Sequence, residues 1–139
     1  MREESAALAA VALASFLTPL ISAATNVAIP SIGEEFGVGA ILLSWIATAH
    51  LLTTAALLVP LGRAADIWGR KKVFLWGLLI YAASSLLAMA SPSAIALIAA
   101  RAVQGAASAM VFATGVAIIS SVFPPGGRGW ALGVNAASI

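Results

Sequence analysis

The apolar residues of this chain form long stretches that are separated by short polar or glycine- and proline-rich segments. Four stretches stand out, at about residues 6–28, 40–61, 73–90 and 94–122. Because about 20 apolar residues cross a bilayer core of roughly 30 Å as a helix, we expect four membrane-spanning helices. A fifth apolar segment, 130–139, is too short to cross. It is either the start of a fifth span or a tail that lies against the others.

The segments between these stretches are short. Pro30 closes the first stretch, and residues 31–39 connect it to the second. Residues 62–72 follow the second stretch, Ser91-Pro92-Ser93 makes a tight turn, and proline and glycine break the chain again at 124–129. The fold class we predict is an all-α integral membrane bundle, with connections that alternate between the two sides of the membrane.

The first stretch has a second interpretation as a signal peptide. However, it is preceded by Met1-Arg2-Glu3-Glu4, which is not positively charged, and its apolar core is longer than that of a usual signal. We therefore interpret residues 6–28 as a retained span.

Composition agrees with lipid as the solvent. Of 139 residues, 62% are hydrophobic and only 9% are charged, whereas a soluble domain has roughly 25% charged residues. The chain has no cysteine, so neither a disulfide framework nor a thiolate metal site is predicted. The basic residues behind the net charge of +2 are too few and too scattered for a nucleic-acid partner.

The positions of the charges predict the orientation. All the loop cations fall on one side of the predicted topology: Arg2, Arg63, Arg70, Lys71, Lys72 and Arg128. Glu34 and Glu35 are the loop charges on the opposite side. Since short loops rich in Lys and Arg stay in the cytoplasm, we expect a multi-pass protein of the inner or plasma membrane with a cytoplasmic amino terminus.

Polar residues within the spans recur at intervals of three and four, which places them on common helix faces. These faces carry Ser15, Thr18, Ser22, Thr25 and Asn26 on the first span, His50, Thr53 and Thr54 on the second, and Arg101, Gln104 and Ser108 on the fourth. For the Ser and Thr positions we favour a structural role, because small residues let membrane helices approach and hydrogen-bond.

Arg101 is the one charged residue within the four predicted spans. An arginine that faces lipid costs about 2.5–3.5 kcal/mol or more, so we expect it to face the bundle interior, where a functional role is favoured over a structural one. His50 fits two roles equally well, as a group that titrates near neutral pH or as a hydrogen-bond partner of a neighbouring helix.

Residues 62–72, GRAADIWGRKK, resemble the cytoplasmic loop between helices two and three of the major facilitator superfamily. In that family the loop contacts the other half of the transporter and helps to hold the outward-facing state. The resemblance assigns this gating role to Gly62, Asp66, Gly69, Arg70 and Lys71. We expect Asp66 to accept hydrogen bonds from a helix end. Ile67 stands where the family usually has a basic residue.

Two further segments resemble the drug/proton antiporter branch of the family, so that the resemblance covers essentially the whole chain. Arg101, Gln104 and Gly105 match an Arg-x-x-Gln-Gly signature of the fourth helix, and residues 26–30 match the end of the first. Trp45 and His50 lie where that branch tends to have Trp and Tyr. Ile21 departs from the pattern, because the branch commonly has an aspartate there.

The resemblance implies that residues 1–139 are the amino-terminal transmembrane bundle of a secondary transporter that exports small organic compounds by alternating access, with protons as a possible coupling ion. Its partners would be the lipid bilayer, the substrate and the remaining helices. Arg101, Gln104, Asn26 and His50 would line the transport path. We expect no enzyme, cofactor or metal. The alternatives are a small oligomeric four-helix carrier, which would need a membrane glutamate that the spans lack, and a non-transporting scaffold or remnant.

Overall fold

The computed structural model describes the backbone of residues 2–137 and the side chains of residues 5–137. Ser138 and Ile139 of the predicted fifth segment, and the side chain of Arg2, lie outside that description. The described chain forms five α-helices: α1 (Arg2–Phe36), α2 (Ala40–Trp68), α3 (Arg70–Met89), α4 (Ala94–Val122) and α5 (Pro125–Ala137). Four of them, α1 to α4, are long and apolar enough to cross a membrane.

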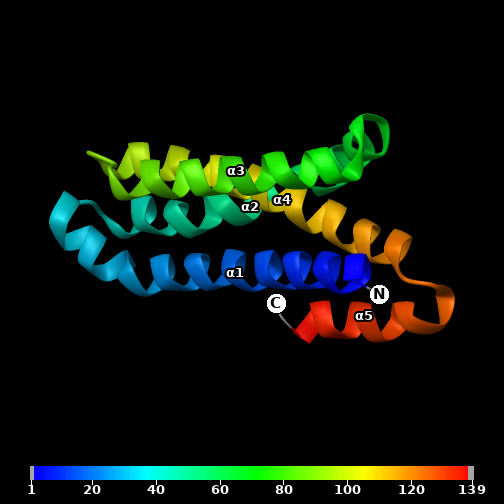
Figure 1. The fold of residues 1–139 in the computed structure, drawn as a ribbon. Helices are drawn as coiled ribbons and strands as arrows, with labels where there is room; N and C mark the ends of the chain where they lie inside the picture. The colour runs from blue at the N-terminus through cyan, green and yellow to red at the C-terminus, as the bar shows by residue number, and fades with distance from the viewer. Residues whose placement is uncertain (1, 138–139) are drawn as a thin grey trace.

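Successive helices run in opposite directions, so the connections collect at the two ends of the bundle (Figure 1). The amino terminus, the α2–α3 turn and the α4–α5 connection lie at one end, and the α1–α2 and α3–α4 connections lie at the other. The chain is thus a multi-pass membrane protein, and the all-α bundle expected from the sequence is confirmed. Arg63, the cations of the α2–α3 turn and Arg128 belong to one end, while Glu34 and Glu35 belong to the opposite end.

Helix α4 is the centre of the bundle because it packs against each of the other four helices. Its surface is rich in alanine and glycine, which lets neighbouring backbones approach closely. At the end that holds the α2–α3 turn, an apolar cluster joins α1, α3, α4 and α5. Its buried members are Leu8, Val11, Ala14, Phe74, Val111, Ile119 and Ala131.

Two expected connections are much shorter in the structure. Pro30 does not close the first helix, because α1 continues through it to Phe36 and leaves Gly37–Gly39 as the link to α2. Proline is tolerated inside membrane helices, where its missing hydrogen bond disrupts a single turn. Likewise, most of residues 62–72 are helical, and Gly69 alone separates α2 from α3. Gly69 has φ of 100°, a left-handed backbone conformation that favours glycine.

Other helix ends follow from local sequence. Ser93 caps α4 by accepting a hydrogen bond from the Ala96 amide at 3.3 Å. The expected break at 124–129 is confined to Phe123 and Pro124, because Pro125 already opens α5 at the first helical position, where proline is favoured. Helix α5 lies against α1 and α4.

Candidate functional site

Arg101 lies on α4 in the interior of the bundle, and its side chain is only 1% exposed. Its guanidinium donates to three acceptors on three helices. They are the Ser22 Oγ of α1 at 2.9 Å, the Ile46 carbonyl of α2 at 3.3 Å, and the Gln104 Oε1 of α4 at 2.9 Å. The prediction that Arg101 faces inward is therefore confirmed. Oxygen atoms of the protein therefore surround the Arg101 guanidinium in place of water or lipid.

Gln104 extends this cluster to α3. Its Oε1 accepts from Arg101, and its Nε2 donates to the Ser85 Oγ at 2.9 Å, while the Ser85 hydroxyl donates to the Tyr81 carbonyl at 2.8 Å. The amide is thus fixed in one orientation, because each of its polar atoms has a partner. A continuous polar chain consequently ties α1, α2, α3 and α4 together around Arg101.

The acceptors of Arg101 are all uncharged. Among the described side chains, the ion pair found is on the α2–α3 turn, between Asp66 and Arg70, and Arg101 has no carboxylate partner. A buried cation without a counter-charge is held only by oriented dipoles, and each charge-assisted hydrogen bond contributes about 1.5–3 kcal/mol. This cluster therefore leaves a net positive charge inside the bundle.

Gln104 also borders a cavity of about 540 Å³ between α1, α3 and α4. Ser85 and Thr25 are further polar residues of its wall, and most of the remaining wall is apolar. The cavity extends towards Glu35 and Phe36 at the end of α1. Ile21, at the position where the family resemblance would place an aspartate, lines the same cavity. An organic molecule in this space would meet the amide that Arg101 orients.

His50 lies on α2, one turn after Ile46, and faces α4. Its side chain is 5% exposed, and its Nδ1 has no hydrogen-bond partner among the described residues. The His50 carbonyl accepts from the Thr54 hydroxyl at 2.8 Å, and the same hydroxyl lies 3.1 Å from the Gly105 carbonyl oxygen of α4. The imidazole is therefore a buried polar group with unused hydrogen-bonding capacity close to the Arg101 cluster.

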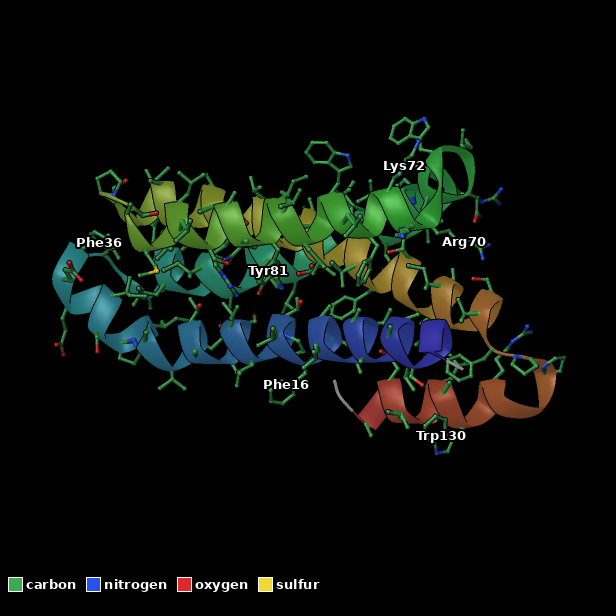
Figure 2. The ribbon with its side chains drawn as sticks, viewed as in Figure 1. Phe16, Phe36, Arg70, Lys72, Tyr81 and Trp130 are labelled. Atoms are coloured by element: carbon green, nitrogen blue, oxygen red, sulfur yellow. The ribbon has the colours of Figure 1, made fainter. Side chains whose placement is uncertain are left out.

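Of the four residues predicted for the transport path, the structure joins Arg101 directly to Gln104 and places His50 on the neighbouring helix. Asn26 is exposed on α1, its side chain makes no hydrogen bond within the described residues, and it does not line the cavity. Sequence reasoning missed Ser85. The available signal was the polar group Tyr81, Ser84 and Ser85 in the otherwise apolar third stretch. Figure 2 shows Tyr81 on the side of α3 that faces α1, where its hydroxyl donates to the Thr18 carbonyl at 2.9 Å.

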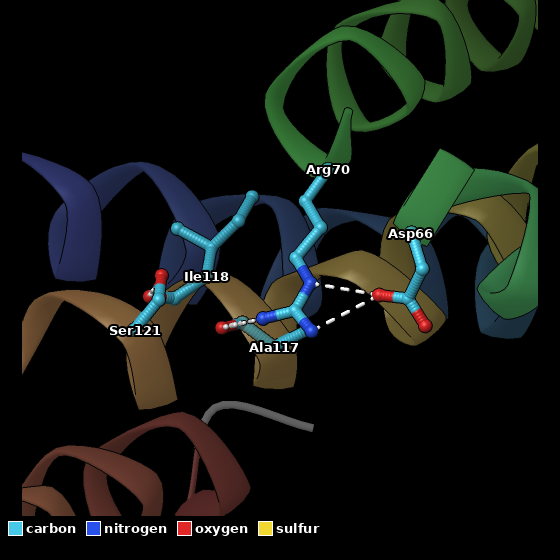
Figure 3. Close-up of polar contacts among 5 residues, drawn as sticks. All are labelled: Asp66, Arg70, Ala117, Ile118 and Ser121. Atoms are coloured by element: carbon cyan, nitrogen blue, oxygen red, sulfur yellow. Dashed lines mark hydrogen bonds and ion pairs between the residues drawn. The ribbon is translucent and has the colours of Figure 1, made fainter. Parts of the chain in front are cut away.

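The α2–α3 turn carries a second polar cluster, at the end of the bundle that holds the amino terminus (Figure 3). Both Nε and one terminal nitrogen of Arg70 lie 3.0 Å from the Asp66 Oδ1, and the other terminal nitrogen donates to the Ala117 carbonyl of α4 at 3.2 Å. The sequence suggested that Asp66 accepts from a helix end. Instead it accepts from the Arg70 side chain one helical turn away, because α2 continues past Asp66 to Trp68.

The other members of the predicted gating segment lie outside the Asp66–Arg70 pair, each in a different local environment. Gly62 lies inside α2, where an added Cβ would make only an ordinary contact with Ala113 at 3.5 Å. Lys71 is exposed in the first turn of α3. The turn is thus a short link whose Asp66–Arg70 pair is attached to the last turns of α4.

Comparison with known proteins agrees with this arrangement. The family model described as Major Facilitator Superfamily matches residues 11–139. The chain belongs to the Major Facilitator Superfamily. The motif that suggested the family, at 62–72, and the Arg101–Gln104–Gly105 signature both fall within the matched part. The resemblance drawn from these residues is therefore confirmed.

Several curated members of the superfamily are similar to this chain. It is 36% identical over 131 residues to the puromycin resistance protein pur8 of Streptomyces alboniger, a match that covers 94% of this chain and 26% of that protein. It is 36% identical over 122 residues to the cephamycin export protein CmcT of Amycolatopsis lactamdurans, covering 88% and 25%. The riboflavin transporter RibZ of Clostridioides difficile is 27% identical over 139 residues, covering 100% and 30%. The chain thus spans between 25% and 30% of the length of these relatives.

Proposed function

We propose that this chain supplies the opening helices of a secondary transporter that exports small organic compounds by alternating access. The observation that carries the proposal is the buried Arg101–Gln104 cluster beside the cavity between α1, α3 and α4. Intramembrane ionisable groups that face a bundle interior mark transport paths by default. The names of the superfamily relatives, which include a resistance protein and an export protein, support small organic compounds as substrates.

The proposed mechanism needs a second half. Transporters of this kind rock two bundles around a site near the membrane midplane. We infer that α1 and α4 face that site, with Gln104 as the polar contact at the cavity wall, and that the missing helices cover the exposed Asn26. His50 remains a candidate path residue because its buried Nδ1 has no partner in the described structure. Coupling to protons is a further part of the proposal, and His50 is its candidate carrier within the described spans.

The α2–α3 turn is the proposed gate on the cytoplasmic side. Arg70 bridges Asp66 on α2 to the Ala117 carbonyl on α4, so breaking this bridge frees the turn from α4. The cations at this end of the bundle also support a cytoplasmic amino terminus in the inner or plasma membrane. In this proposal the gate closes when the turn meets the second half of the transporter.

The test is a flux measurement on the complete protein that contains this chain, reconstituted into proteoliposomes with puromycin and a cephamycin as the first compounds. Arg101→Ala should abolish transport while protein levels in the membrane stay unchanged. Arg101→Lys should also fail, because an ammonium on a flexible stem does not reproduce the fork that reaches three acceptors. Arg63→Ala, which removes an exposed arginine of α2, is the matched control and should transport normally.

The outcomes separate the parts of the proposal. Normal flux in Arg101→Ala would reject the role of Arg101 but keep the transporter. Absence of flux in the unsubstituted protein, across a panel of organic cations, anions and neutral compounds, would reject the transport function.

A further inference from the structure

A groove runs along the outside of the bundle at the end that holds the α2–α3 turn. It lies between the first turns of α1, the start of α3 and the end of α4, and its volume is about 560 Å³. Its lining is mostly apolar, with only Arg70, Lys71 and Ser121 as polar members. The apolar lining residues are Ala6, Ala7, Ala10, Phe74, Leu75, Ile118 and Val122.

The two cations of the groove differ in how many of their hydrogen-bond donors already have a partner. All three nitrogens of Arg70 contact Asp66 or the Ala117 carbonyl. Lys71, the next residue, is exposed and makes no hydrogen bond or ion pair within the described part of the chain. Figure 3 shows Arg70 pointing at α4 beside Ile118 and Ser121, two residues of the groove wall. The groove therefore combines a held guanidinium with a free ammonium.

The position of these cations selects the kind of molecule that would fit. Arg70 and Lys71 occupy the first turn of a helix that is long and apolar enough to span a membrane. Basic residues at the ends of such helices are attracted to the anionic headgroups of the bilayer. From there the groove continues past Phe74 and Leu75, one turn deeper in α3. Basic pockets between membrane helices on the cytoplasmic side bind anionic lipid headgroups. A free phosphate would not contact the apolar lining of the groove, and a purely apolar ligand would leave Lys71 without an anionic partner.

We propose that this groove binds one anionic phospholipid. The lipid phosphate contacts Lys71 and the spare N–H groups of Arg70, and one acyl chain lies along Leu75 and Ile118 towards the alanines of α1. The site lies between α1, α3 and α4 and shares no lining residue with the cavity beside Arg101. It requires α3 to begin at the membrane surface but does not depend on transport, so it goes beyond the proposed function.

The chain offers a matched control for the test. Lys72 has the same charge and follows Lys71 directly, but it does not line the groove. In Figure 2, Lys72 lies on the upper side of the start of α3, away from α1, whereas Arg70 lies on its lower side. The experiment is native mass spectrometry of the complete detergent-purified protein, titrated with phosphatidylglycerol and, in parallel, with phosphatidylcholine.

We expect the unsubstituted protein to retain one phosphatidylglycerol at concentrations where phosphatidylcholine does not bind. Lys71→Gln should weaken that binding about fivefold, the factor expected for one cation near a lipid phosphate. Lys72→Gln should weaken it clearly less than Lys71→Gln does, because a cation outside the groove contributes only diffuse attraction that salt screens. Ala10→Trp, which fills the apolar part of the groove, should also weaken binding, and circular dichroism checks that each variant is folded.

Three results would overturn the proposal. Equal losses in Lys71→Gln and Lys72→Gln would mean diffuse attraction to a basic surface. Displacement of the lipid by inorganic phosphate would mean a free-anion site. Normal binding in a folded Ala10→Trp variant would place the lipid elsewhere. Each readout is independent of flux, so a failure here is distinguishable from a failure of the proposed transport.

Discussion

At the scale of single residues, Gly105 sets how closely α2 and α4 approach. A Cβ placed there would collide with the His50 carbonyl oxygen and would lie 3.0 Å from the Thr53 Cβ. Because the first obstacle is backbone, it cannot move aside as a flexible side chain would. We expect Gly105→Ala to force the two helices apart and to lower the free energy of unfolding by about 1–3 kcal/mol. Unfolding in detergent, followed by circular dichroism, measures the change.

Gly133 provides the control for this substitution. It lies exposed on α5, and an added Cβ would meet nothing within 4 Å. Gly133→Ala should therefore leave stability unchanged or raise it by up to about 1 kcal/mol through helix propensity. Equal behaviour of the two variants would mean that the α2–α4 interface tolerates an extra methyl group, and the close approach at Gly105 would lose its significance.

The residue scale also shows what the sequence could reveal about the site. Arg101 and Gln104 were predictable because they are polar residues three positions apart in an apolar helix, and lipid forces such residues inward. Two other members of the cluster were not predictable in this way. Ile46 contributes a backbone carbonyl to Arg101, which no side-chain pattern reveals. Ser85, which accepts from the Gln104 amide, comes from a helix with few polar residues. Asn26 was predicted to share the polar face of its helix, but it lies exposed at the edge of that face.

At the scale of elements, we expect a substitution in the α2–α3 turn to change transport while it leaves the free energy of unfolding nearly unchanged. The Asp66–Arg70 pair is an exposed i,i+4 pair, with side chains 55% and 42% exposed, so it contributes only about 0.3–0.5 kcal/mol. Asp66→Ala should therefore barely alter unfolding. If the turn is a gate, however, losing Asp66 frees Arg70 and slows the conformational cycle. We expect turnover in proteoliposomes to fall severalfold with little change in KM.

Glu34→Ala, which removes an exposed acid at the other end of the bundle, is the control for Asp66→Ala and should transport at the normal rate. Unchanged turnover in Asp66→Ala would reject the gate. A rise in KM at constant turnover would instead place Asp66 in substrate binding.

The helices themselves were more predictable than their ends. Long apolar stretches predict spans because an unpaired backbone is too costly in lipid, whatever the exact side chains. Glycine and proline are weaker signals in this setting. Pro30 lies inside α1, and the glycine-containing segment 62–68 is helical, because a helix can continue beyond its apolar stretch. Gly69 separates α2 from α3 because its φ of 100° redirects the backbone. The sequence alone does not show that Gly69, and not Gly62, adopts this conformation.

At the scale of the whole molecule, the bundle exposes many large apolar side chains, among them Trp76, Leu86 and Ile95. Lipid can cover those on the outside, and the proposed second half of the transporter would cover the rest. The apolar sides of the bundle fit the membrane in either orientation, so the charged ends must determine which end lies in the cytoplasm. The end with the α2–α3 turn carries exposed Arg63, Lys71 and Lys72, so the net bias in loop charge should hold it in the cytoplasm.

The absence of cysteine makes this orientation directly testable, because any introduced thiol is the only cysteine of the chain. Glu34→Cys and Pro92→Cys lie at the exposed end opposite the amino terminus, and Lys72→Cys lies at the basic end. We expect a membrane-impermeant maleimide to label the first two in intact cells and the third only after permeabilisation. The reverse pattern would invert the topology and move the Asp66–Arg70 pair to the outer side. In that case the turn could not be a cytoplasmic gate, whereas the buried Arg101 cluster would keep its place at the centre of the bundle.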